Sequence, residues 1–187
     1  MLFIAIMKQI VLKILVAGDA SVGKTTLLHR YVEGEFIDTF QMTIGVDFKN
    51  KRIQKENLTC HLQLWDLGGQ ERFRFMHEAY LRGAHGALLL FDITNYTSFV
   101  NIEKWVQLLR KQNSELPIIL VASKYDLEEF SMVGDYYASL TQKRFNFIEY
   151  VKTSSKWGLN LEEPFNLIAD HLLEVEDIGK KESAFKI

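Results

Sequence analysis

Three nearly continuous apolar runs, each as long as a typical β-strand, constrain the fold most strongly. They cover residues 10–17, 86–91 and 117–122. Such runs suit parallel strands that are buried on both faces. Two stretches between or after them, residues 99–109 and 161–172, place apolar side chains at helical spacing. Alternating strands and helices predict an α/β domain with three layers, and its ligand should bind where the carboxyl ends of the strands meet.

A hairpin and a last strand complete the sheet that the sequence predicts. Residues 58–64 alternate apolar and polar side chains, as a strand with one wetter face does. Residues 47–55 precede them across a short polar link, so the two segments are expected to pair as antiparallel strands. Residues 146–151 form the expected last strand. Asn160, with Glu163 three residues later, resembles a capping arrangement that would begin the last helix.

The length and composition of the chain predict one domain. The chain has 187 residues, of which 48% are hydrophobic and 25% charged, and its formal net charge is -2. We expect a single domain over residues 1–187, with a core from about 10 to 174. An apolar extension at 1–9 and a polar tail at 175–187, expected to fray, flank this core. The balanced charge gives no reason to expect nucleic acid as a partner, and we expect a monomer.

Features near both ends bear on where the chain is found. The apolar run at residues 1–7 is too short to span a bilayer, and it extends the first strand or precedes a start at Met7. Residue 2 is Leu rather than Gly and the chain ends without a Cys, so we expect no direct lipid anchor. The single cysteine, Cys60, indicates a reducing compartment. We expect a cytoplasmic protein that would reach a membrane through a protein partner.

A glycine-rich segment between the first strand and the first helix carries the strongest chemical signal. Residues 18–25 fit the pattern G-x-x-x-x-G-K-[ST], in which glycines let successive backbone N–H groups turn inward on a phosphate. We expect Lys24 to bridge the β- and γ-phosphates and the Thr25 hydroxyl to ligate Mg²⁺. A chance glycine-rich turn is the alternative. The expected nucleotide contacts here are Ala20, Ser21, Val22, Gly23, Lys24, Thr25 and Thr26.

The end of the alternating strand carries a second signal. Asp66 stands where a carboxylate can reach the Mg²⁺ shell through a water, and Gly69 lets the backbone approach the γ-phosphate. Gln70 follows at the place where a side chain can orient an attacking water. An isolated Asp before two glycines is more often a turn former, but the phosphate motif upstream favours the catalytic interpretation.

These residues resemble the Ras-superfamily small GTPases over nearly the whole chain, from about residue 13 to 173. The resemblance is strongest to the Rab-like branch, at residues 43–48 (first switch) and at residues 65–73 and 80–84 (second switch and the helix after it). It implies a six-stranded, mostly parallel sheet with about five helices. It also implies that Thr43 ligates Mg²⁺ when GTP is bound and that Phe36 packs edge-on against the guanine.

The second switch departs from the pattern of Rab, Ras and Rho proteins. Those proteins usually carry Thr-Ala-Gly where this chain has Leu67, Gly68 and Gly69. A Gly-Gly pair is more like Arf proteins, heterotrimeric G-protein α subunits and the fungal GTPases of mitotic exit and septation. The fungal proteins also carry a similar guanine motif. An archaeal or early-branching Rab-like protein is a further alternative.

The segment after the third apolar run is expected to select the base. Guanine offers N1–H and N2–H₂ as adjacent donors, so the carboxylate of Asp126 can accept both and reject adenine. The family motif is Asn-Lys-x-Asp, and here Ser123 replaces the Asn. Lys124 should lay its stem along the ribose and base. Because a hydroxyl has less reach than the amide that ties neighbouring loops together, we expect weaker nucleotide retention.

A second segment resembles the Thr-Ser-Ala-Lys signature of the family. Ser154, Ser155 and Lys156 follow the predicted last strand and would be ordinary loop residues on their own. In register with the upstream motifs, the resemblance implies that the backbone N–H of Ser155 donates to guanine O6. It also implies that Lys156 covers the ring.

Together these motifs predict a GTP/GDP switch with Mg²⁺ as cofactor. Effectors, exchange factors and activating proteins should read the loops at about residues 37–48 and 66–82. Hydrolysis should be slow, on the order of 10⁻⁴ to 10⁻³ s⁻¹, without an arginine finger. Residues 37–43 contain no Arg, so such a finger would come from a partner.

Two other classes stay open at this point. A P-loop kinase or ATPase would share residues 18–25 but has no need of Asp126. A nucleotide-binding scaffold without hydrolysis is favoured only by the departures at Ser123 and Gly68. The intact residues that oppose it are Lys24, Thr25, Thr43 and Gln70.

Overall fold

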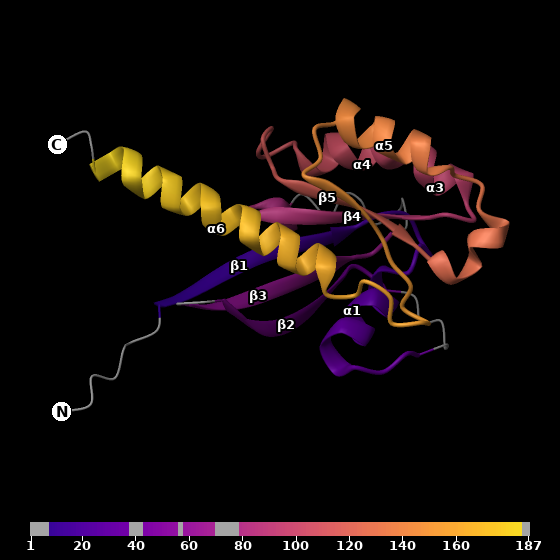
Figure 1. The fold of residues 1–187 in the computed structure, drawn as a ribbon, viewed down its shortest axis with the longest axis horizontal. Coiled ribbons are helices and arrows are strands. Elements are labelled where there is room, and N and C mark those ends of the chain that lie inside the picture. Colours follow the sequence, from indigo (N-terminus) through magenta and orange to yellow (C-terminus); the bar gives the residue numbers. More distant parts are fainter. Residues whose placement is uncertain (1–7, 38–42, 56–57, 70–78, 185–187) are drawn as a thin grey trace.

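The computed structural model describes residues 8–37, 43–55, 58–69 and 79–184, with backbone alone for 176–184. A six-stranded sheet runs through its centre in the order β2-β3-β1-β4-β5-β6 (Figure 1). Only β2 and β3 pair antiparallel, and the other neighbours are parallel. The predicted α/β architecture and its hairpin are thereby confirmed. The strands are β1 (Lys8–Ala17), β2 (Val46–Lys55), β3 (Leu58–Leu67), β4 (Gly86–Asp92), β5 (Ile118–Ser123) and β6 (Glu149–Lys152).

Helices cover both faces of the sheet, as the three-layer prediction requires. Figure 1 shows α3, α4 and α5 over one face, with α1 and α6 over the other. Buried side chains of β1 alternate between the two cores, because Leu15 packs in the cluster of Trp105 and Ile14 in the cluster of Leu27 and Phe165. The described helices are α1 (Lys24–Glu33), α3 (Tyr96–Val100), α4 (Ile102–Leu109), the 3-10 helix η2 (Tyr125–Phe130), α5 (Asp135–Arg144) and α6 (Glu163–Ala184).

The register of the sheet brings the strand ends that matter to one edge. Val16 of β1 pairs with Asp66 of β3, and Asp92 of β4 pairs with Ser123 of β5. Because β1, β3, β4 and β5 all run parallel, the loops that follow them leave from the same edge. The motifs at residues 18–25, 66–69 and 123–126 are therefore neighbours in space although they are far apart in sequence.

One prediction about the last helix is wrong, and the fraying of its end stays a prediction. It begins at Glu163, and the backbone N–H of Asn166 donates to Glu162 O, so Asn160 does not cap it. Asn160 has a φ of 50°, and its side-chain amide donates to Lys152 O at 3.0 Å, which uses the side chain in the loop instead. The tail from residue 175, expected to fray, continues as helix to Ala184. None of the helices in the described ranges combines the length and apolar character needed to cross a bilayer.

Candidate nucleotide-binding site

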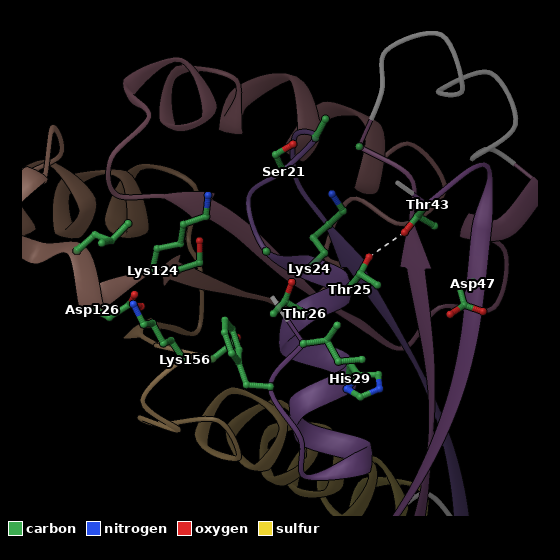
Figure 2. A pocket seen from close by; sticks show the side chains of 18 of the residues that line it. Ser21, Lys24, Thr25, Thr26, His29, Thr43, Asp47, Lys124, Asp126 and Lys156 are labelled. Atoms are coloured by element: carbon green, nitrogen blue, oxygen red, sulfur yellow. Dashed lines mark hydrogen bonds between the residues drawn. The ribbon is translucent and has the colours of Figure 1, made fainter. Parts of the chain in front are cut away.

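A cavity of about 650 Å³ opens at the carboxyl edge of the sheet, within the size range of small-molecule sites (Figure 2). Most of the predicted site residues line it. These are Ala20, Ser21, Gly23, Lys24, Thr25, Thr26, Phe36, Thr43, Gly69, Ser123, Lys124, Asp126, Ser155 and Lys156. The structure therefore brings together motifs that are spread over more than a hundred residues of the sequence, from Ala20 to Lys156.

The glycine-rich loop between β1 and α1 has backbone angles that favour glycine. Gly18 has a φ of 137°, and a Cβ there would lie 2.3 Å from the carbonyl oxygen of Leu90. Gly23 has a φ of 95° and is the N-cap of α1. The loop thus wraps close to β4 and delivers the amino end of α1 to the cavity. A helix amino end offers free N–H groups and a partial positive charge, which suit a phosphate.

Lys24 is a buried cation at this helix start. Its side chain is 5% exposed, and its Nζ donates to the carbonyl oxygens of Gly18 (2.9 Å) and Asp19 (2.7 Å). Burial lowers the pKa of Lys24 to about 8, while the charges of Asp66 and Asp19 oppose that shift. The loop therefore holds an ammonium group that burial leaves short of solvation, and an anion beside it would restore the favourable charge balance.

Three side-chain oxygens, from two threonines and one aspartate, converge at the amino end of α1. Thr25 Oγ1 lies 2.8 Å from Thr43 Oγ1 and donates to Asp66 Oδ2 at 2.5 Å, while Thr43 Oγ1 donates to the same oxygen at 3.2 Å. Figure 2 shows the two threonine side chains pointing toward each other across the cavity. They come from α1 and from the segment before β2, so this contact joins the first switch to the phosphate loop.

Asp66 is the buried member of this group. It is 2% exposed, and its Oδ1 has no hydrogen-bond partner among the described residues. Burial raises the pKa of Asp66, opposed by Lys24 and by the hydroxyls of Thr25 and Thr43. Two hydroxyls and a carboxylate with an unpartnered oxygen fit Mg²⁺, which prefers oxygen ligands. No group of three or more His, Cys, Asp or Glu side chains in the described ranges offers another metal site.

Glycines bring the second switch against the rest of the site. A Cβ on Gly69 would lie 2.4 Å from the backbone of Asp19 and Ala20, so this backbone touches the phosphate loop. Gly68 donates its N–H to Gly45 O at 2.8 Å, and a Cβ there would lie 2.8 Å from the same oxygen. Gln70, the predicted water-orienting residue, lies outside the described residues.

Ser123 connects the base end of the cavity to the phosphate loop. Its hydroxyl lies 2.5 Å from Val22 O and 2.9 Å from Phe91 O, and the side chain is 6% exposed. Although a hydroxyl has less reach than an amide, this one meets the neighbouring loop, because the backbone of Val22 passes within hydrogen-bonding distance. A hydroxyl carries one proton and donates to one of these carbonyls at a time. Weaker nucleotide retention stays a prediction.

The carboxylate of Asp126, predicted to bind the base, is oriented by a buried serine. Ser154 Oγ donates to Asp126 Oδ1 at 2.6 Å, and Ser154 is fully buried. Ser154 also accepts from the backbone N–H of Trp157 at 3.1 Å. Ser154 and Val22 are fully buried and are not among the residues that line the cavity, so a nucleotide contact by either stays a prediction. They support the residues that line it.

Lys124 has a backbone and a partner that the sequence did not indicate. Its φ is 62°, and its Nζ lies 2.6 Å from Asp92 Oδ2. Asp92 is itself held by Thr94, whose backbone N–H and hydroxyl both donate to Oδ1. The lysine stem lines the cavity while its ammonium is fixed by the end of β4. Ser155 and Lys156 also line the cavity, and Figure 2 shows Lys156 near Asp126.

Five lining residues were missed by the sequence reasoning. Asp47 pairs with Asp66 across the hairpin, so the predicted antiparallel pairing carried the signal for its place. His29 lies five residues after Lys24 on α1, and its Nδ1 is 3.0 Å from Glu35 O. The full set is His29, Ile37, Asp47, Lys49 and Leu127.

Comparisons with known proteins agree with this geometry. The model of the Ras family matches residues 13–174. The GTP-binding protein YPTM1 of Zea mays is 40% identical over 154 residues, which cover 82% of this chain and 74% of that protein. The Ras-related protein RABD1 of Arabidopsis thaliana is 37% identical over 161 residues, covering 86% and 78%. The Ras-related protein Rab-26 of Rattus norvegicus is 36% identical over 181 residues, covering 96% and 70%. This chain belongs to the Ras family of small GTPases, in its Rab-like branch.

Proposed function

We propose that this chain is a GTP/GDP switch that requires Mg²⁺ and hydrolyses GTP slowly. The contact of Thr43 with Thr25 and Asp66 carries the proposal, because it ties the first switch to the expected metal ligands. When bound, Mg²⁺ supplies positive charge that neutralises the phosphates. With GTP bound, Thr43 would contact Mg²⁺ and the γ-phosphate. Loss of the γ-phosphate would remove these contacts, and the first switch would relax.

Guanine selection is assigned to Asp126. Its Oδ1 is held by Ser154, which fixes the plane of the carboxylate at the edge of the cavity. Two carboxylate oxygens can accept N1–H and N2–H₂ of guanine together, whereas adenine offers no such pair of donors. Ser155 and Lys156 lie close enough to line the same end, which supports their predicted roles at O6 and over the ring.

Hydrolysis is assigned to positioning rather than to proton abstraction. Lys24 places an ammonium at the β- and γ-phosphates, and the Gly69 backbone stands against the phosphate loop, where its N–H can donate to the γ-phosphate. Gln70 would orient the attacking water. Without an arginine finger from a partner, turnover on the order of 10⁻⁴ to 10⁻³ s⁻¹ is expected.

Partners are expected to bind the two switches. The described part of the first switch exposes Ile44 (71%) and, at the start of β2, Phe48 (44%). The ring of Phe48 packs edge-on against Trp65, with centroids 5.4 Å apart, so a partner would meet apolar side chains held in place from below. We assign to this surface an effector, an exchange factor or an activating protein. The Rab-like sequence favours trafficking or signalling, in a cytoplasmic monomer that meets membranes through a partner.

The test of the proposed function is the nucleotide that the purified chain holds and turns over. Denatured protein should release GDP or GTP in a near-stoichiometric amount, and adenine nucleotide there would overturn the proposal. Single-turnover assays with GTP and Mg²⁺ should give slow hydrolysis that Gln70→Leu abolishes without loss of binding. Bound guanine nucleotide with no hydrolysis would favour the scaffold alternative. The contact of Ser123 with Val22 supports hydrolysis over that alternative, because the replaced residue still ties the base end to the phosphate loop.

A further inference from the structure

The carboxylate of Asp19, in the phosphate loop, is held by a helix that the nucleotide site does not otherwise use. Asn101 Nδ2 donates to Asp19 Oδ2 at 2.6 Å, and Trp105 Nε1 donates to Asp19 Oδ1 at 2.8 Å. These partners lie 82 and 86 residues away in sequence. Both are neutral donors, and each gives the carboxylate a hydrogen bond of fixed direction.

The two donors belong to one helical turn. Asn101 stands in the break between α3 and α4, and Trp105 follows four residues later, so their side chains share one face. Trp105 is 1% exposed in the core cluster, and the Asn101 side chain makes no capping hydrogen bond to α4. The indole N–H is the only donor on a tryptophan side chain, and in Trp105 it donates to Asp19. The core thus fixes the direction of both hydrogen bonds.

The backbone of Asp19 contacts two other parts of the site. Its carbonyl oxygen accepts from Lys24 Nζ at 2.7 Å. A Cβ on Gly69 would lie 2.4 Å from Asp19 C and O, so the second switch packs directly on this peptide. A rotation of the Asp19 peptide would therefore move an acceptor of Lys24 and a contact of Gly69 together.

We propose that Asn101 and Trp105 are positioning residues that slow nucleotide release by fixing the Asp19 carboxylate, and with it the peptide that Lys24 and Gly69 contact. An anionic side chain beside the phosphates repels them, and a released carboxylate could pair with the Lys24 ammonium in their place. The two neutral donors prevent this competition and fix the loop. The inference rests on the proposed function, because it concerns the retention of guanine nucleotide.

The test is the release rate of a fluorescent N-methylanthraniloyl-GDP, chased with excess GDP in Mg²⁺ buffer. Trp105→Phe keeps an aromatic ring in the core and removes the N–H, so release should become about tenfold faster. Asn101→Ala removes the other donor and no helix cap, and should act in the same direction. Leu109→Ala is the control, because Leu109 is equally buried on α4 and packs in the same cluster. Its release rate should stay within about twofold of the parent.

A double-mutant cycle separates the effect of the two hydrogen bonds to Asp19, called the clamp here, from the effect of core packing. In the Asp19→Ala background there is no carboxylate to restrain, so Trp105→Phe should no longer change the release rate. An equal acceleration with and without Asp19 would overturn the proposal, as would parental release rates in folded Trp105→Phe and Asn101→Ala. Failure of the parent chain to bind any guanine nucleotide would instead overturn the proposed function, and the clamp with it.

Discussion

At the phosphate end of the cavity the two charged side chains are buried, whereas at the base end the predicted base-contacting side chains are half-buried or exposed and rest on buried residues. Lys24 and Asp66 are 5% and 2% exposed. Asp126 and Ser155 are half-buried and Lys156 is exposed, while the residues beneath them, such as Ser154, are fully buried. At the phosphate end, buried side chains would themselves contact the nucleotide. At the base end, more exposed side chains would contact it and buried residues support them.

This difference explains how the chain can depart from the family motif at Ser123. The phosphate end requires each buried polar group to meet the others directly, and Lys24, Thr25, Thr43 and Asp66 all match the family pattern. At the base end, the replacement at Ser123 keeps a contact with Val22 because the support only needs a donor at the correct distance. Changes at the phosphate end should therefore cost more than changes at the base end.

The largest effect is expected for Lys24→Met. Removing a buried cation that faces the phosphates should weaken GDP binding at least about 100-fold, since breaking a buried charge pair costs about 3–5 kcal/mol. Equilibrium titration with a fluorescent GDP measures this. Lys49→Met is the control, because Lys49 lines the same cavity but pairs with Glu33 at its surface. An affinity equal to that of the parent would contradict the role of Lys24.

The next effect should fall on base choice. The parent should bind GDP about tenfold more tightly than IDP, which lacks the N2 amine. Asp126→Ala should weaken GDP binding about 100-fold and abolish the preference over IDP, because the paired acceptor is lost. Competition titrations give both constants. Glu128→Ala, two residues on and outside the cavity lining, should keep the preference. A preference that survives in Asp126→Ala would move base recognition elsewhere.

The buried lysine also predicts a pH effect of about tenfold. Its pKa of about 8 without nucleotide lies below the ordinary 10.5, so the unfolded chain binds more protons between these values. The nucleotide-free fold should therefore gain stability as the pH rises through this window. Phosphate favours the ammonium, so GDP affinity should fall about tenfold between about pH 7 and about pH 9.

Calorimetry in buffers of different ionisation enthalpy checks this directly. Near about pH 8, where half of the Lys24 side chains are already protonated, GDP binding to the parent should take up about half a proton per site. Lys24→Arg should show no such uptake, because guanidinium stays protonated in this range. Equal proton uptake by the two proteins would assign the titration to another group.

A smaller effect is expected where the switches touch. Gly68→Ala places a methyl 2.8 Å from Gly45 O and 2.9 Å from Thr43 O, so the first switch must shift. The Mg²⁺ concentration needed to retain nucleotide should rise about fivefold, as overpacking costs about 1–3 kcal/mol. Gly134→Ala is the matched control, because nothing lies within 4 Å of a Cβ there. Identical Mg²⁺ dependence in both variants would show that the switches adapt without cost.

The smallest effect should come from Ser123→Asn, which restores the residue usual in the family. Because the hydroxyl already reaches Val22 O, nucleotide release should change by less than about threefold. Release kinetics of the fluorescent GDP measure this. A release about tenfold slower than in the parent would show that the serine is a weak tie, as the sequence alone suggested.

The layers of the fold and most of the site could be predicted because they depend on local patterns. The apolar run at residues 10–17 lies within β1, and the alternation at 58–64 lies within β3. The loop at 18–25 has a conformation that its glycines permit. The start of α6 could not be predicted from Asn160, because its side chain bonds Lys152 O across the loop, a contact that no local pattern encodes.

Residues that act through distant partners were also beyond the sequence. From the sequence, Asp19 is an ordinary loop residue. Only the fold shows that Asn101, just before α4, and Trp105, within α4, donate to its carboxylate. Asp47 enters the cavity only because the hairpin register sets it opposite Asp66. Lys124 meets Asp92 because β4 and β5 end side by side.

The sequence by itself determined which chemical groups are available and the order in which the strands and helices carry them. Apolar period and glycine placement are local properties, so they fix the elements and the phosphate loop without reference to the rest of the chain. The tertiary structure decided which polar groups pair with one another. Burial removes water from Asp66 and Ser123, and their partners Thr25, Thr43 and Val22 are residues that only the packed sheet brings within hydrogen-bonding distance.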